Sequence, residues 1–112
     1  MAKLRTDRIE KELIGINKLK NAMELVFARE QKSYENYIRL LTNIQFKVLT
    51  AIAKAGGRQV FSAAFMKPSG FTNPSTVRRA VNRLLQLNIL FESSGEYRFV
   101  NPFFRAWIIY QG

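Results

Sequence analysis

One helix-forming segment, residues 72–87, constrains the fold of this chain more than any other. Asn73 is a favoured cap residue and Pro74 fits the first helical position, so the helix has a defined start. Its apolar residues recur at intervals of three and four and share one face; they are Val77, Ala80, Val81, Leu84 and Leu85. The opposite face carries Ser75, Arg79, Asn82 and Gln86, with Arg78 and Arg83 on its flanks. The pattern predicts a helix that packs on a core through one side and offers arginines and amides on the other.

A β-hairpin is predicted directly after this helix. Residues 89–100 contain two short β-rich runs around a Ser-Ser-Gly-Glu turn, which is a hairpin signal. Upstream, residues 43–55 are amphipathic, with Thr42 or Asn43 as cap and a glycine pair as stop. A helix, helix, turn, helix and hairpin order is complete if one more short helix lies between residues 55 and 72.

Residues 59–67 supply that helix. A short extended run is predicted at residues 59–61, and Ser62 can cap a brief helix over residues 63–67, which Pro68 ends. The complete order is helix, short strand, helix, turn, helix and hairpin. It predicts a mainly α fold with a small β-hairpin, namely a winged helix-turn-helix with an N-terminal helical extension.

The extension comprises residues 1–41 and the winged helix-turn-helix domain residues 42–112. Apolar residues at spacings of three and four predict one or two long helices in the extension. We expect the stretch from Val26 onward to pack on the chain's own domain. The stripe from Ile9 to Leu19 is expected to contact another molecule or another domain.

Most aromatic side chains are expected to fill the core rather than to stack on nucleic-acid bases. Base stacking needs exposed rings beside basic groups, whereas most of these rings fall where a winged helix builds or closes its core. The expected core set is Phe46, Phe61, Phe65, Phe71, Phe91, Phe99, Phe103, Phe104 and Trp107. Tyr34 and Tyr110 are expected nearer the surface.

Five segments carry a resemblance to a known family: residues 28–37, 46–53, 74–85, 95–99 and 101–108. The last, Asn-Pro-Phe-Phe-Arg-Ala-Trp-Ile, is the most distinctive. From about residue 25 to residue 109 the chain resembles the carboxy-terminal winged-helix domain of archaeal and bacterial P-loop ATPases of the AAA+/STAND type. That family usually closes with Asp-Pro-hydrophobic-Phe-Arg-x-Trp, and here Asn101 replaces the acid. The resemblance implies either one module of a larger ATPase or a free-standing relative of that module.

The composition argues against catalysis by this chain. The six glycines never have phosphate-loop spacing, so ATP binding is not expected. Without His or Cys there is no imidazole base, no thiolate nucleophile and none of the usual soft metal ligands. General acid–base catalysis by paired carboxylates would have to use Glu92 and Glu96. Both lie at the end of the predicted hairpin, where they are more simply explained as solvated side chains. We expect no enzyme activity, no cofactor and no metal.

The chain carries a net charge of +10, which favours polyanionic partners. Residues 1–56 hold eleven bases and six acids, and residues 57–112 hold seven bases and two acids, so each half contributes +5. The charge is therefore not confined to one helix. No signal peptide or membrane span is recognisable, and we expect a cytoplasmic location.

The functional prediction is non-catalytic binding of duplex DNA through the helix over residues 73–88. Ser75 at the helix start would face phosphate, and Arg79 and Asn82 would read base edges. The remaining predicted DNA-binding residues are Arg78, Arg83, Gln86, Arg58 and Arg98.

Two alternatives stay open. One is a docking domain of an ATPase that contacts a protein and not DNA, which the acidic residues of the hairpin favour. The other is a free-standing regulator that dimerises through residues 1–41 and reads half-sites about 10 base pairs apart.

Overall fold

The computed structural model describes the backbone of residues 2–111 and the side chains of residues 8–111. Met1 and Gly112, the outermost residues of the predicted extension and domain, lie outside the described residues. The chain divides into two compact units, residues 1–32 and residues 33–112. The predicted boundary between residues 41 and 42 stays a prediction.

A single helix, α1 (Ala2–Arg39), forms the first unit and continues into the second. The apolar stripe of the first unit is exposed: Ile16 keeps 62% of its surface and Leu19 keeps 64%. Ile9 and Leu13 are more than half exposed as well. An exposed stripe of this kind is what the predicted intermolecular or interdomain contact requires.

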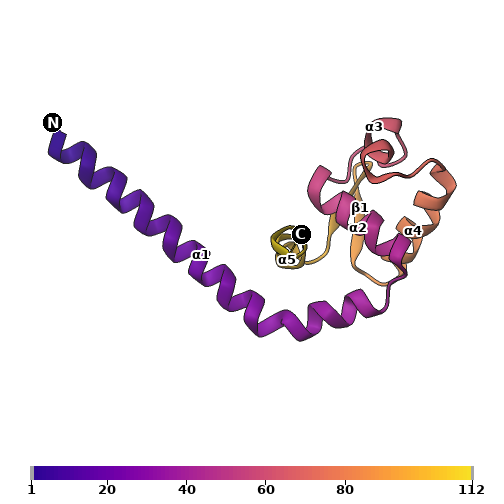
Figure 1. The fold of residues 1–112 in the computed structure, drawn as a ribbon, viewed down its shortest axis with the longest axis horizontal. Helices are drawn as coiled ribbons and strands as arrows, with labels where there is room; N and C mark the ends of the chain where they lie inside the picture. Colours follow the sequence, from indigo (N-terminus) through magenta and orange to yellow (C-terminus); the bar gives the residue numbers. More distant parts are fainter. Residues whose placement is uncertain (1, 112) are drawn as a thin grey trace. The chain divides into compact units, whose positions relative to one another are not determined.

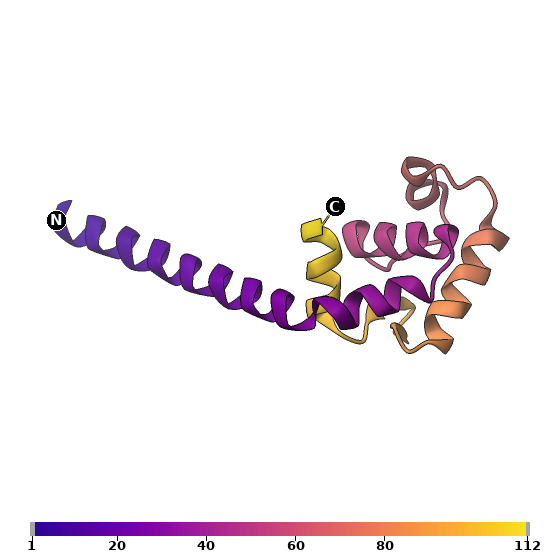
Figure 2. The ribbon, with the colours of Figure 1, turned by 60° about the horizontal axis from the view of Figure 1, so that its bottom comes forward.

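The second unit contains four α-helices, a 3₁₀ turn and a hairpin among the described residues (Figure 1). In chain order after α1 they are α2 (Asn43–Ala55), α3 (Ala63–Met66), η1 (Lys67–Ser69), α4 (Pro74–Gln86), β1 (Leu90–Ser93), β2 (Glu96–Phe99) and α5 (Pro102–Gln111). Helix α2 contacts α4, α5 and η1, and the hairpin packs on α4 and α5 (Figure 2). The predicted fold class, mainly α with a small hairpin and a winged helix-turn-helix order, is confirmed.

Local side-chain bonds set the helix starts, as predicted. Thr42 and Gln45 form a reciprocal capping box at α2, which resolves the choice between Thr42 and Asn43. The Ser62 hydroxyl accepts from the N–H of Phe65 at α3. Gly56 ends α2 with φ of 88°, a backbone conformation that residues other than glycine rarely adopt.

The hairpin is antiparallel, and Leu90 lies opposite Phe99. Its two turn residues, Ser94 and Gly95, have φ of 51° and 79°. Positive φ at both central residues marks the type I′ turn, whose twist matches that of the flanking strands. The predicted hairpin with its turn at Ser-Ser-Gly-Glu is therefore confirmed.

The predicted extended run at residues 59–61 is wrong. Gln59 has φ of 49°, and its carbonyl accepts from the N–H of Ser62 at 3.0 Å, so this segment turns. The backbone contact with the hairpin is made earlier in the chain, where the N–H of Tyr97 donates to the carbonyl of Gly57 at 3.0 Å. Gly57, which precedes the predicted run, thus bonds to β2 through one residue, and residues 59–61 form a turn instead of a strand.

Four of the aromatic predictions are also wrong. Tyr34 is only 1% exposed, because its ring meets Phe104 and Trp107 of α5 with centroids 5.1 and 5.3 Å apart. Three rings expected in the core are exposed, because they fall beside the buried stripe of their own element: Phe46, Phe91 and Phe103. Tyr110 is exposed, as expected.

Candidate nucleic-acid interface

Helix α4 has the two faces that its sequence predicts. Val77, Ala80, Val81 and Leu84 are buried, and α4 contacts α2 and β1. Side chains of the opposite face are exposed, namely Ser75, Arg78, Arg79, Asn82, Arg83 and Gln86. The helix starts as predicted, with Asn73 as the cap and Pro74 as its first residue, and it ends two residues earlier than the predicted residue 88, because Leu87 closes the last turn.

The start of α4 is held by Asn73. Its side-chain oxygen accepts from the N–H of Ser75 at 2.9 Å and from the Ser75 hydroxyl at 2.7 Å. The N–H of Thr76 donates to the Asn73 carbonyl, and Pro74 has no N–H to offer. The donors predicted to face phosphate are therefore already engaged within the turn, and a phosphate contact at this point depends on arginine side chains.

The three arginines of α4 differ in their surroundings. The guanidinium of Arg78 lies over the ring of Phe61, 4.4 Å from its centroid, in a cation–π arrangement. For Arg79 and Arg83, no side-chain hydrogen bond or ion pair forms with the part of the chain that is described. These two exposed charges are uncompensated, and they are the strongest candidates on α4 for contact with a polyanion.

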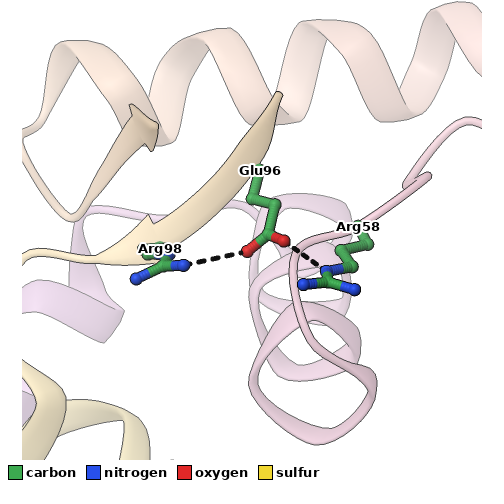
Figure 3. A network of polar contacts seen from close by, with 3 residues as sticks. All are labelled: Arg58, Glu96 and Arg98. Atoms are coloured by element: carbon green, nitrogen blue, oxygen red, sulfur yellow. Dashed lines mark hydrogen bonds and ion pairs between the residues drawn. The ribbon is translucent and has the colours of Figure 1, made fainter. Parts of the chain in front are cut away.

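Two other predicted DNA contacts, Arg58 and Arg98, converge on one carboxylate. Figure 3 shows Glu96 between them: Arg58 Nε donates to Oε1, and Arg98 Nη2 donates to Oε2 at 3.2 Å. Arg58 follows α2, whereas Glu96 and Arg98 lie two residues apart on β2 and so share a face of the strand. The carboxylate offsets part of the positive charge that these arginines present to solvent.

The two arginines lower the pKa of the Glu96 carboxyl below its usual value. The hydrogen bond from Arg58 lowers its pKa most, and the charge of Arg58 and the bond and charge of Arg98 act in the same direction. Partial burial of the carboxylate raises the pKa, but the arginines outweigh it. The sequence predicted a solvated Glu96 and did not reveal this network. The spacing of Glu96 and Arg98, two residues apart on a predicted strand, could have indicated their ion pair, but nothing in the sequence indicated the contact with Arg58.

The lowered pKa predicts an acid-dependent loss of stability. Because Glu96 is a stronger acid in the folded state, its contribution is present above the unfolded-state pKa and is lost as pH falls through the folded-state pKa. Glu96→Gln should remove that part of the pH dependence and lower the melting temperature near neutral pH. Thermal unfolding from pH 7 to pH 3 measures it, with Glu92→Gln as the matched control. Parallel pH curves for wild type and Glu96→Gln would contradict the assignment.

The closing motif has a structural explanation. Asn101 Oδ1 accepts from the N–H of Phe103 at 2.9 Å and of Phe104 at 3.4 Å, so it caps α5. An aspartate would make the same bonds, which explains why Asn101 can stand in its place. Arg105 Nε donates to the carbonyl of Ala53 at 3.0 Å and ties α5 to the end of α2.

The described residues hold no group of three or more His, Cys, Asp or Glu side chains suited to a metal ion. Among the helices that the structure describes, none combines the length and apolar character needed to cross a bilayer.

Residues 32–110 match a protein family described as "Probable winged helix domain". No curated protein and no solved structure matches the chain. The matched range contains α2 to β2 and nearly all of α5, and it starts within α1.

Proposed function

Since the chain belongs to the winged helix domain family, we propose that it is a non-catalytic module that binds duplex DNA through the exposed face of α4. The observation that carries the proposal is the pair of uncompensated arginines, Arg79 and Arg83, beside exposed Asn82 on a helix whose other face is buried. Such a helix fits the major groove, where arginine favours guanine and asparagine favours adenine.

The remaining residues divide into three roles. Arg78 rests on Phe61 and would contact a phosphate beside the helix. Ser75 and Gln86 lie at the two ends of the exposed face; the Ser75 hydroxyl, which donates to Asn73, can still accept at the groove edge, and the Gln86 amide can accept or donate there. Arg58 and Arg98 would contribute less to DNA affinity than the arginines of α4, because both form ion pairs with Glu96.

The double substitution Arg79→Ala, Arg83→Ala tests this proposal. We expect duplex affinity to fall at least about tenfold, because the phosphate contact of Arg83 is lost together with the base contact of Arg79, which is worth about 1–3 kcal/mol. The measurement is fluorescence anisotropy of a labelled duplex at fixed salt, with the fold of each variant checked by circular dichroism.

Lys18→Ala, Lys20→Ala is the matched control, because it removes the same charge from exposed positions on α1. Equal affinity losses for the two double variants would mean that net basicity alone attracts DNA, and the α4 proposal would be withdrawn.

A docking role is the second candidate, and the Glu96 network favours it. A hairpin whose Arg98 is held by a carboxylate, which also engages the neighbouring Arg58, approaches DNA phosphates less favourably than a free basic wing. In the ATPases that the sequence resembles, such a domain would contact an ATPase module through this rigid surface. The resemblance in residues 101–108 supports that origin, and a cytoplasmic location fits it.

A third use of the chain is self-association. The exposed stripe of α1 from Ile9 to Leu19 supports contact with an ATPase module or with a second copy of the chain. Sedimentation of the wild-type chain and of an Ile16→Glu variant separates a self-associating stripe from one that needs a different partner.

A further inference from the structure

A groove of about 520 Å³ opens between α2 and the segment formed by α3 and η1. Phe46, Thr50 and Ala51 line it from α2, and Ala64, Phe65 and Pro68 line it from the other side. No residue of α4 or of the hairpin takes part, so the groove is a surface separate from the proposed DNA contact.

The floor of this groove is apolar in character. Thr50 is one of its few polar residues, and its hydroxyl already donates to the carbonyl of Phe46 at 2.9 Å. Phe46 is 37% exposed, although burial of a phenylalanine side chain is favourable. A ligand that brings apolar side chains would cover this ring and the alanines beside it, whereas the polar edges of nucleic-acid bases would find few partners.

The rim of the groove is basic. Lys47 and Lys54 both line it, are both exposed and stand two helical turns apart, so they lie on the same side of α2. Residues 36–91 contain eight lysines and arginines and no aspartate or glutamate. No carboxylate of this long segment can neutralise the rim or repel an acidic ligand.

We propose that this groove binds an acidic amphipathic segment of a partner protein. Leucine or aromatic side chains of that segment enter between α2 and α3, and two carboxylates meet Lys47 and Lys54. Seven helical residues span about 10 Å, so the two carboxylates lie seven residues apart in a helical segment or three apart in an extended one.

Selection of a random dodecapeptide phage library on the full-length chain tests the proposal. One selected peptide, made synthetically with a fluorescent label, is then titrated with wild type and variants. We expect selected peptides to combine Asp or Glu with Leu, Phe or Trp. Lys47→Glu, Lys54→Glu should weaken binding at least tenfold, and Phe46→Ala should weaken it severalfold.

Two controls locate the site. Lys18→Glu, Lys20→Glu makes the same charge change on α1 and should alter affinity less than threefold, and Arg79→Ala, Arg83→Ala should do the same. Peptide binding that survives this α4 change supports the groove whether or not α4 binds DNA.

Four outcomes would overturn the proposal. They are failure to select any acidic peptide, equal losses from the groove and α1 charge reversals, loss of peptide binding in the α4 variant, and displacement of the peptide by a single-stranded oligothymidylate whose own binding needs Lys47 and Lys54. The last outcome would assign the groove to nucleic acid.

Discussion

Gly57→Ala is expected to destabilise the compact unit by about 2–5 kcal/mol, although it adds only one methyl group. A Cβ at this position would lie 1.7 Å from the carbonyl oxygen of Tyr97, and the obstructing atoms are backbone, which cannot rotate away. The two segments must separate, which adds overpacking strain and loses the Tyr97 N–H to Gly57 bond. A fall in melting temperature of more than about 10 °C is expected in a thermal scan.

Gly15→Ala provides the matched control. Gly15 lies within α1 with no atom within 4 Å of an added Cβ, so the same substitution should strengthen the helix by about 0.5–1 kcal/mol. Circular dichroism should show equal or greater helix content. A melting temperature for Gly57→Ala within about 2 °C of wild type would contradict the close approach of Gly57 to β2.

Phe104→Ala is expected to cost about 3–5 kcal/mol, the usual range for a buried aromatic ring. Phe104 is 2% exposed and joins four rings, those of Tyr34, Tyr37, Phe99 and Trp107, whose centroids lie 5.1 to 6.1 Å away. Removing it leaves a cavity where α5 meets the hairpin and residues 34–37. Chemical denaturation of wild type and variant measures the loss.

Phe104→Leu separates ring contacts from simple volume. Leucine keeps much of the buried apolar surface but none of the aromatic geometry, so its loss should be well under that of the alanine variant. If Phe104→Ala unfolds with a free energy within about 1 kcal/mol of wild type, Phe104 does not hold this cluster together.

The elements whose signals lie within one segment could be predicted from the sequence. Helix α4 follows from the Asn73-Pro74 start and the spacing of its apolar residues, and the hairpin follows from the Ser94-Gly95 turn. Caps are also local, because the Thr42 and Ser62 hydroxyls bond within three residues. The exposed α4 face came from the same periodicity, and its role in DNA binding remains the proposal.

Features that depend on partners far along the chain could not be predicted in this way. Tyr34 is buried by α5, whose position no pattern around residue 34 reveals. Arg58 meets Glu96 across 38 positions, so two residues with separate assignments turned out to form one network. Residues 59–61 have strand-like composition, but the chain must reverse there to start α3, and the turn at Gln59 prevails.

The central claim is that α4 binds duplex DNA through its own arginines, and the salt dependence of binding tests it most directly. Affinity for a labelled duplex is measured at several salt concentrations for wild type and for Arg79→Ala, Arg83→Ala. The predicted result is a log-log slope that corresponds to about four or more phosphates in wild type, with a weaker affinity and a shallower slope in the variant. Absence of binding at physiological salt, or the same slope for both proteins, would contradict it and favour the docking role.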